Sequence, residues 1–166
     1  ADVIIYAGSL VNPALLDYAG EKCAIHNSAS MTLDEVTGIM EKHRDDIVVR
    51  LHTGDPCIYG AIREQMDILD LKRIPYESVP GVSSFIGAAA ALSAEFTLPG
   101  VSQSVILTRM AGRTPVPERE DITRMASHGA SMVIFLTSTM LRELSEKLIE
   151  GGYAPESPAA VVYKAT

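Results

Sequence analysis

The sequence predicts an α/β fold in which short buried strands alternate with helices along the chain. Two observations carry this prediction. Apolar, β-branched runs such as Val3–Tyr6 and residues 132–136 have the length and composition of buried strands. These runs end at polar or glycine-containing turns, and helical patterns follow the turns. Because parallel strands need such crossover connections, we expect largely parallel pairing with helices flanking the sheet.

In the first part of the chain, local signals mark where helices begin. Asn12 and Pro13 form a cap and first-turn pair for a short helix. Thr32 and Glu35 have the spacing of a capping box, and the helix that follows carries an apolar stripe that packs on a sheet. Here the expected strands are residues 3–6, 23–26, 47–51 and 74–79, and the expected helices are residues 14–18, 33–44, 61–69 and 85–92.

Residues 97–100 read as a linker, so we expect a domain boundary between residues 97 and 98. The two predicted domains are residues 1–97 and 98–166. In the second domain we expect strands over residues 104–107, 132–136 and 159–163, and helices over residues 122–127 and 141–148.

Composition restricts the classes of partner. The net charge of −7 argues against a broad nucleic-acid-binding surface. No apolar run approaches the roughly 20 residues of a membrane helix. Cys23 and Cys57 form neither a disulfide framework nor a metal-ligand cluster, so we expect reduced thiols, no bound metal and a cytoplasmic location.

Two turns are candidates for ligand binding. The first, Thr53-Gly54-Asp55-Pro56, follows an apolar run, where α/β sheets commonly bind ligands. Its glycine lets a ligand approach the main chain, although the same residues also make ordinary turns. The second turn spans residues 80–84 and repeats the order of strand, glycine turn, serine and helix.

A third candidate is the loop of residues 108–117, which holds Arg109 and Arg113 within an acidic chain. Arginine binds carboxylates through its planar fork, which favours an anionic ligand. A solvated connector is the alternative for this loop.

Together these motifs resemble the tetrapyrrole methylase family, whose members use S-adenosylmethionine and release S-adenosylhomocysteine. The resemblance runs through the whole chain and comprises residues 1–11, 51–60, 79–84, 107–117, the strand to Leu136, and residues 161–166. Within the family, the loops at residues 51–65 and 108–118 are most similar to the branch that methylates C11 of precorrin-4 or cobalt-precorrin-4 in cobalamin synthesis.

The resemblance implies two α/β domains, the first with a largely parallel sheet and the second with a mixed sheet. It also implies a corrinoid substrate and a homodimer. Carried over by motif, the expected cofactor-binding residues are Thr53, Gly54, Asp55, Ile58, Ser83, Ser84, Leu136 and Ala165. The expected substrate-binding residues are His52, Tyr59, Arg109 and Arg113.

One departure concerns length. The family opens with a strand and a glycine-rich Gly-x-Gly-x-Gly-Asp-Pro loop, and it continues beyond the last strand of this sequence. We therefore expect the chain to be truncated at both ends relative to the family.

The chemistry implied is transfer of a sulfonium methyl group to a carbon of the macrocycle, for which the protein mainly orients the reactants and excludes water. We assign no general base. A sister enzyme methylating another corrin position, a relative acting on RNA or protein, and a non-catalytic α/β binding module remain alternatives. Whether the substrate contains cobalt is left open.

Overall fold

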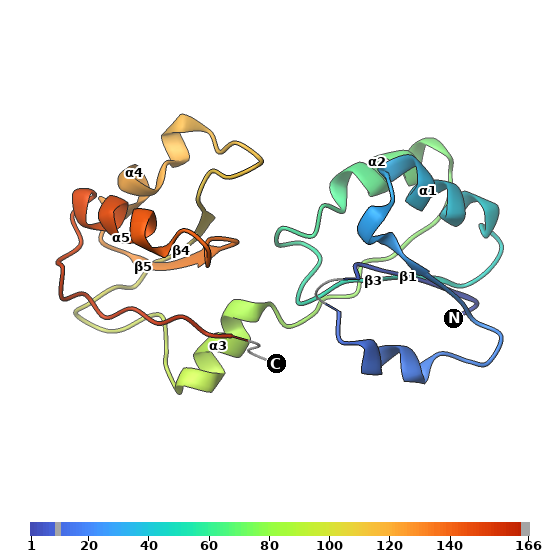
Figure 1. Ribbon diagram of the computed structural model, residues 1–166, viewed down its shortest axis with the longest axis horizontal. Helices are drawn as coiled ribbons and strands as arrows, with labels where there is room; N and C mark the ends of the chain where they lie inside the picture. The colour runs from blue at the N-terminus through green and yellow to red at the C-terminus, as the bar shows by residue number, and fades with distance from the viewer. Residues whose placement is uncertain (9–10, 164–166) are drawn as a thin grey trace. The chain divides into compact units, whose positions relative to one another are not determined.

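The computed structural model describes residues 1–8 and 11–163. The chain forms two compact units, Ala1–Ser84 and Phe85–Thr166, each with its own sheet (Figure 1). The domain boundary expected between residues 97 and 98 stays a prediction, which limited proteolysis would test. Over the described ranges, no helix is long and apolar enough to cross a membrane.

The first unit is built on a parallel sheet of β1 (Val3–Tyr6), β2 (Ala24–Asn27) and β3 (Val48–Leu51) in the order β2-β1-β3. In its register, Ile5 of β1 lies opposite His26 of β2 and Arg50 of β3. Because the strands are parallel, their carboxyl ends lie at one edge of the sheet. The first candidate turn therefore begins at that edge.

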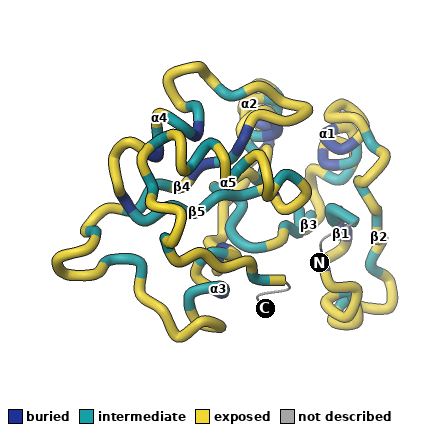
Figure 2. The backbone as a smooth tube through the Cα atoms, turned by 60° about the vertical axis from the view of Figure 1, so that its left-hand side comes forward, coloured by how far each residue is buried: buried dark blue, intermediate teal, exposed yellow. Residues whose placement is uncertain are grey.

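Helices α1 (Leu33–Lys42) and α2 (Arg63–Leu71) cover one face of this sheet (Figure 1). The expected capping box opens α1, since the Thr32 main-chain N–H donates to Glu35 Oε2 at 2.7 Å and the Glu35 N–H donates to Thr32 Oγ1 at 3.3 Å. The core between helices and sheet is the darkest part of this unit in Figure 2. Its buried residues are Val3, Ile5, Val36, Met40, Leu69 and Ile74.

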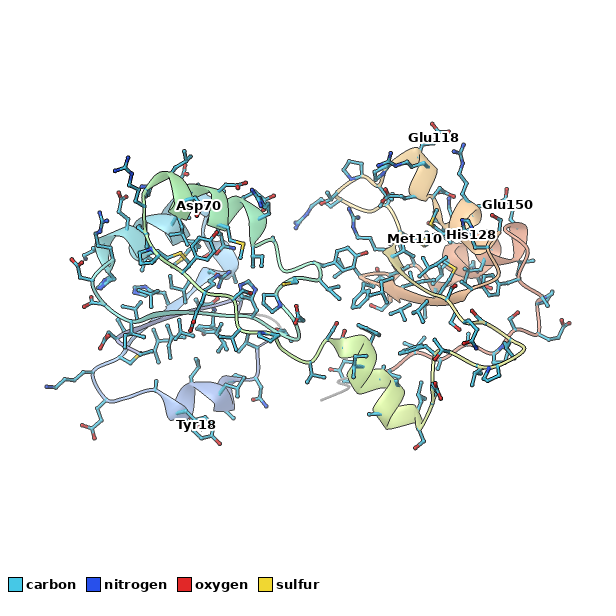
Figure 3. The ribbon with its side chains drawn as sticks, turned by 180° about the vertical axis from the view of Figure 1, so that it is seen from behind. Tyr18, Asp70, Met110, Glu118, His128 and Glu150 are labelled. Atoms are coloured by element: carbon cyan, nitrogen blue, oxygen red, sulfur yellow. The ribbon has the colours of Figure 1, made fainter. Side chains whose placement is uncertain are left out.

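The other face of the sheet carries η1 (Pro13–Tyr18), a 3-10 helix whose first turn is capped by the Asn12 side chain. The expected cap at Asn12 is confirmed. Tyr18 projects from η1 away from the strands (Figure 3). A second 3-10 helix, η2 (Ser28–Ser30), follows β2, and the Ser28 hydroxyl donates to the Tyr6 carbonyl at 3.0 Å.

The second unit contains two parallel strands, β4 (Val105–Arg109) and β5 (Ser131–Phe135). Helices α4 (Ile122–Ala126) and α5 (Leu141–Glu150) pack together, and Lys147 Nζ on α5 bonds Asp121 Oδ2 just before α4 at 3.1 Å. A short 3-10 helix, η3 (Glu118–Glu120), precedes α4. On α3 (Ser84–Leu92), Phe85 packs its ring against those of Phe96 and Phe135.

These elements confirm the α/β fold, with two corrections. Residues 74–79 and 159–163 were expected to be strands, but the structure has no strand at either place. Pro75 removes a main-chain donor from the first segment, and a strand forms only where a partner takes up its hydrogen bonds. In its described part, the sheet of the second unit is the parallel pair β4-β5, and the mixed sheet that the resemblance implies stays a prediction.

Candidate ligand-binding site

The turn after β3 has a backbone that depends on glycine. Gly54 has a φ of +68°, which glycine adopts without a steric penalty. A Cβ at this position would lie 3.5 Å from the Ser83 Cα and 3.6 Å from the Ser84 main-chain nitrogen. The turn at residues 53–55 and the turn at residues 80–84 are therefore in direct contact.

Gly81 makes this contact possible. A Cβ added to Gly81 would lie 2.1 Å from the carbonyl oxygen of Gly54, far inside van der Waals contact. The two main chains approach so closely that only glycine fits between them. The two turns therefore lie side by side, and main-chain groups make up much of the surface that they form together.

Asp55 ties the same two turns together. Its Oδ1 accepts a hydrogen bond from the Cys57 main-chain N–H at 2.8 Å, and its Oδ2 accepts one from the Gly81 N–H at 3.0 Å. These main-chain bonds hold the pKa of the Asp55 carboxyl below its usual value, and the bond from Cys57 has the larger effect. Asp55 is thus ionised near neutral pH, and its bonds shape the turn.

The end of the loop is strained. Tyr59 and Ala61 have φ values of +56° and +50°, a region that costs a residue with a Cβ about 1–2 kcal/mol. Between them, a Cβ on Gly60 would lie 2.0 Å from the Pro56 carbonyl oxygen. Strained backbone of this kind is concentrated at ligand-binding sites. The segment folds back on itself before α2 begins at Arg63, two residues later than the helix expected from residue 61.

His52, at the start of the loop, has an unpaired buried atom. Its Nε2 is buried and has no hydrogen-bond partner among the described residues. Burial, together with the charge of Arg50, lowers the pKa of His52, so the imidazole is neutral near pH 7. A neutral imidazole nitrogen without a partner is suited to a hydrogen bond with a ligand.

In the second unit, Arg109 lies at the carboxyl end of β4. Its guanidinium donates to the carbonyl oxygens of Met110, Thr114 and Pro115 at 3.2, 3.0 and 2.9 Å. These bonds fasten the loop of residues 110–115 to the strand. Arg113, on the same loop, forms no hydrogen bond or ion pair with another described residue.

Leu136, directly after β5, has a φ of +57° and is 69% exposed. Beside it, the buried Thr137 hydroxyl donates to the Phe135 carbonyl at 2.6 Å and accepts from the Met110 N–H at 3.4 Å. The Thr137 side chain therefore joins the carboxyl ends of β4 and β5, next to an exposed leucine held in an unusual conformation.

A cavity of about 410 Å³ lies in this unit. Met110, Glu118 and Glu150 are among its lining residues and are labelled in Figure 3. Arg109 also lines it. The acidic groups here are partly neutralised, since Arg124 bonds Glu118 at 2.8 Å.

With this geometry established, comparison with known proteins assigns the family. The profile of the Tetrapyrrole (Corrin/Porphyrin) Methylases matches residues 1–166. The chain belongs to this family. The cobalt-precorrin-4 C(11)-methyltransferase of Methanocaldococcus jannaschii is 54% identical to it over 168 residues, which cover 100% of this chain and 65% of the relative. The chain therefore spans about 65% of the length of this curated relative.

Solved structures of tetrapyrrole methylases share the fold. A cobalt precorrin-4 methyltransferase matches with a TM-score of 0.89 and 44% identity, covering 93% of this chain and 65% of that one. A uroporphyrin-III C-methyltransferase from Thermus thermophilus, solved with S-adenosylhomocysteine, has a TM-score of 0.71 and 21% identity, covering 93% and 67% of the two chains.

Within this tetrapyrrole methylase fold, the expected cofactor residues fall into three groups. The structure brings together those of the first unit, whereas Leu136 lies in the second unit and Ala165 lies outside the described residues. The residues brought together are Thr53, Gly54, Asp55, Ile58, Ser83 and Ser84, and the Ile58 N–H donates to the Asp55 carbonyl at 3.3 Å. Of the expected substrate residues, His52 directly precedes the first turn and Tyr59 follows it, whereas Arg109 and Arg113 belong to the second unit.

Sequence reasoning missed Arg50, Gln65 and Thr137 as residues that shape these loops. An arginine within an apolar strand was a usable signal for Arg50, because a buried charge needs partners. The roles of Gln65 and Thr137 depend on contacts distant in sequence, and no local pattern indicates them.

Proposed function

We propose that the protein is an S-adenosylmethionine-dependent C-methyltransferase of cobalamin biosynthesis, acting at C11 of precorrin-4 or cobalt-precorrin-4. The observation that carries this proposal is the 54% identity, over the whole chain, to a relative named cobalt-precorrin-4 C(11)-methyltransferase. The match includes both candidate turns and the arginine loop. The homodimer expected from the family resemblance and the cytoplasmic location expected from the cysteine content belong to the same proposal.

The turns of the first unit fit the proposed methyl donor. S-adenosylmethionine carries an amino acid group and a nucleoside, which main-chain groups and hydroxyls can bind. The close approach of the two turns places the main-chain carbonyl of Val82 and the main-chain nitrogen of Ser84 beside Gly54. In this proposal the donor is held by Thr53, Gly54, Asp55, Ile58, Ser83 and Ser84, with Leu136 and Ala165 as further contacts.

When bound, S-adenosylmethionine supplies an activated methyl group, so the protein needs no nucleophile of its own. The residues of this chain act by holding the two reactants in line and by excluding water. Asp55 does not serve as a catalytic acid in this scheme, because its two oxygens accept main-chain hydrogen bonds and its lowered pKa keeps it ionised. Asp55 contributes by fixing the geometry of the loop.

Substrate carboxylates are proposed to bind Arg109 and Arg113, with His52 and Tyr59 also contacting the substrate. The two arginines are expected to differ. Arg113→Ala removes a guanidinium that forms no hydrogen bond or ion pair with another described residue, so KM should rise with little change in stability. Arg109→Ala also releases the loop that it fastens, so stability should fall as well. Unchanged KM values in both variants would refute the carboxylate contact.

Isothermal titration calorimetry with S-adenosylhomocysteine tests the cofactor proposal, with the Methanocaldococcus jannaschii relative as positive control. We expect saturable binding with one site per chain. Absence of binding by the protein, where the control binds, would refute the methyltransferase proposal and favour a non-catalytic module. Product analysis by NMR, with cobalt-containing and metal-free substrates supplied separately, then distinguishes methylation at C11 from methylation at another position.

A further inference from the structure

A continuous path of hydrogen bonds joins the first sheet to the end of the candidate loop. Arg50 Nη1 on β3 donates to the Ile5 carbonyl on β1 at 3.1 Å, and Arg50 Nε donates to Gln65 Oε1 on α2 at 3.3 Å. Gln65 Nε2 then donates to the Ala61 carbonyl at 2.8 Å. Strand, helix and loop are thereby connected through two side chains.

The two side chains suit this arrangement for specific reasons. Gln65 is only 8% exposed, and its amide can accept from a guanidinium through the oxygen while donating to a carbonyl through the nitrogen. Arg50 forms no ion pair with any acidic group in the described part of the chain, so its charge is directed to the Ile5 carbonyl and the Gln65 amide. A partly buried arginine without a carboxylate partner is unusual, which argues that its contacts have a purpose beyond charge pairing.

The path ends where the loop is strained. Ala61 and Tyr59 both have positive φ values, and a residue with a Cβ keeps such a conformation only when its surroundings hold it. The bond from Gln65 to the Ala61 carbonyl is one such restraint. At the other end of the loop, the bonds of Asp55 provide a second.

We propose that Arg50 and Gln65 are positioning residues that hold the loop of residues 53–61 in its ligand-binding shape. The inference rests on the proposed function only for the identity of the ligand. If the restraint is removed, the loop populates other conformers, and the apparent affinity falls in proportion to the fraction that stays competent.

The substitution Gln65→Glu isolates the bond to the loop. A glutamate still accepts from Arg50, but it has no proton to donate to the Ala61 carbonyl, so two acceptors face each other. We expect S-adenosylhomocysteine to bind about 5–10-fold more weakly, the effect of losing one hydrogen bond. The matched control is Gln103→Glu, the same chemical change at an exposed glutamine, for which we expect unchanged affinity.

A double-mutant cycle with Ala61→Gly tests the strain. Glycine adopts a positive φ freely, so the loop needs the restraint less in this background. Gln65→Glu should therefore cost less affinity on top of Ala61→Gly than it does in the natural chain. Equal costs in both backgrounds would overturn the link between Gln65 and the strained residue.

Hydrogen exchange separates failure of this inference from failure of the proposed function. If the natural protein does not bind S-adenosylhomocysteine, the methyltransferase proposal fails, yet the positioning role is still measurable without a ligand. We expect Gln65→Glu to speed amide exchange in residues 53–61 about 5–10-fold while exchange in β1 and α1 is unchanged. Unchanged exchange in the loop, or equal acceleration everywhere, would refute the positioning role.

Discussion

Replacing Gly81 with alanine tests the contact between the two turns most directly. The added Cβ would lie 2.1 Å from the Gly54 carbonyl oxygen, whereas a carbon and a carbonyl oxygen in contact are normally about 3.3–3.6 Å apart. One turn must therefore move by more than about 1 Å. The same movement lengthens the 3.0 Å bond between the Gly81 N–H and Asp55. Gly81 does not have a positive φ, so the effect is purely steric.

Overpacking of this kind costs about 1–3 kcal/mol of unfolding free energy, and the weakened bond to Asp55 adds to that cost. Urea unfolding should show this loss as a lower midpoint with an unchanged slope. Calorimetry with S-adenosylhomocysteine should show weaker binding even at temperatures where the variant is folded, because the two turns have separated. The two measurements together distinguish a local change from general destabilisation.

Gly38→Ala is the matched control, since it makes the same substitution on the exposed surface of α1 with nothing within 4 Å of the added Cβ. Here alanine should stabilise the protein by about 0.5–1 kcal/mol, because it suits a helix better than glycine does. If Gly81→Ala unfolded at the same urea concentration as the natural protein and bound ligand equally well, the reasoning about close main-chain contact would be wrong.

Three further predictions concern individual side chains. Asp55 has a lowered pKa, so its stabilisation is present above the unfolded value of about 3.9 and is lost as pH falls through the folded value. Asp55→Asn should therefore lower the urea midpoint at neutral pH, and the difference from the natural protein should shrink in acid. His52 also has a lowered pKa, so stability should decline as pH falls below about 6.5, and urea titrations should show a shallower decline for His52→Gln. Thr32→Ala removes the cap of α1 and should cost about 1 kcal/mol, measured by urea unfolding; no loss would mean that the cap bond contributes nothing.

Features that depend on neighbouring residues could be predicted from the sequence. The capping box at Thr32 and Glu35 is a local signal, because both partners lie within one helical turn. The apolar runs that became β1 and β5 were equally recognisable from composition. Residues 74–79 show where such reasoning fails: they are apolar enough for a strand, but a strand also requires a partner, and Pro75 weakens the pairing.

The candidate site could be predicted only in part, because some of its contacts also join residues distant in sequence. Gly54 and Asp55 stand out as turn residues, but the contact with Gly81 joins positions far apart in the sequence. Arg109 was expected to bind substrate carboxylates from its charge alone, whereas its bonds to three loop carbonyls are a product of the fold. Local chemistry indicates which residues are suited to a site, and only the fold shows which of their atoms are already engaged.

In the proposed cofactor site, the two restraints on the loop of residues 53–61 explain how few charged groups suffice to select a ligand. Asp55 fixes its first turn against Gly81, and Gln65 fixes its last residues through Arg50 to the sheet. A loop held at both ends loses little further freedom when a ligand binds, so less of the interaction energy is spent on ordering it. Main-chain groups in a fixed arrangement then recognise the shape of the ligand. The residues with positive φ, Tyr59 and Ala61, both lie in the segment that these two restraints bound.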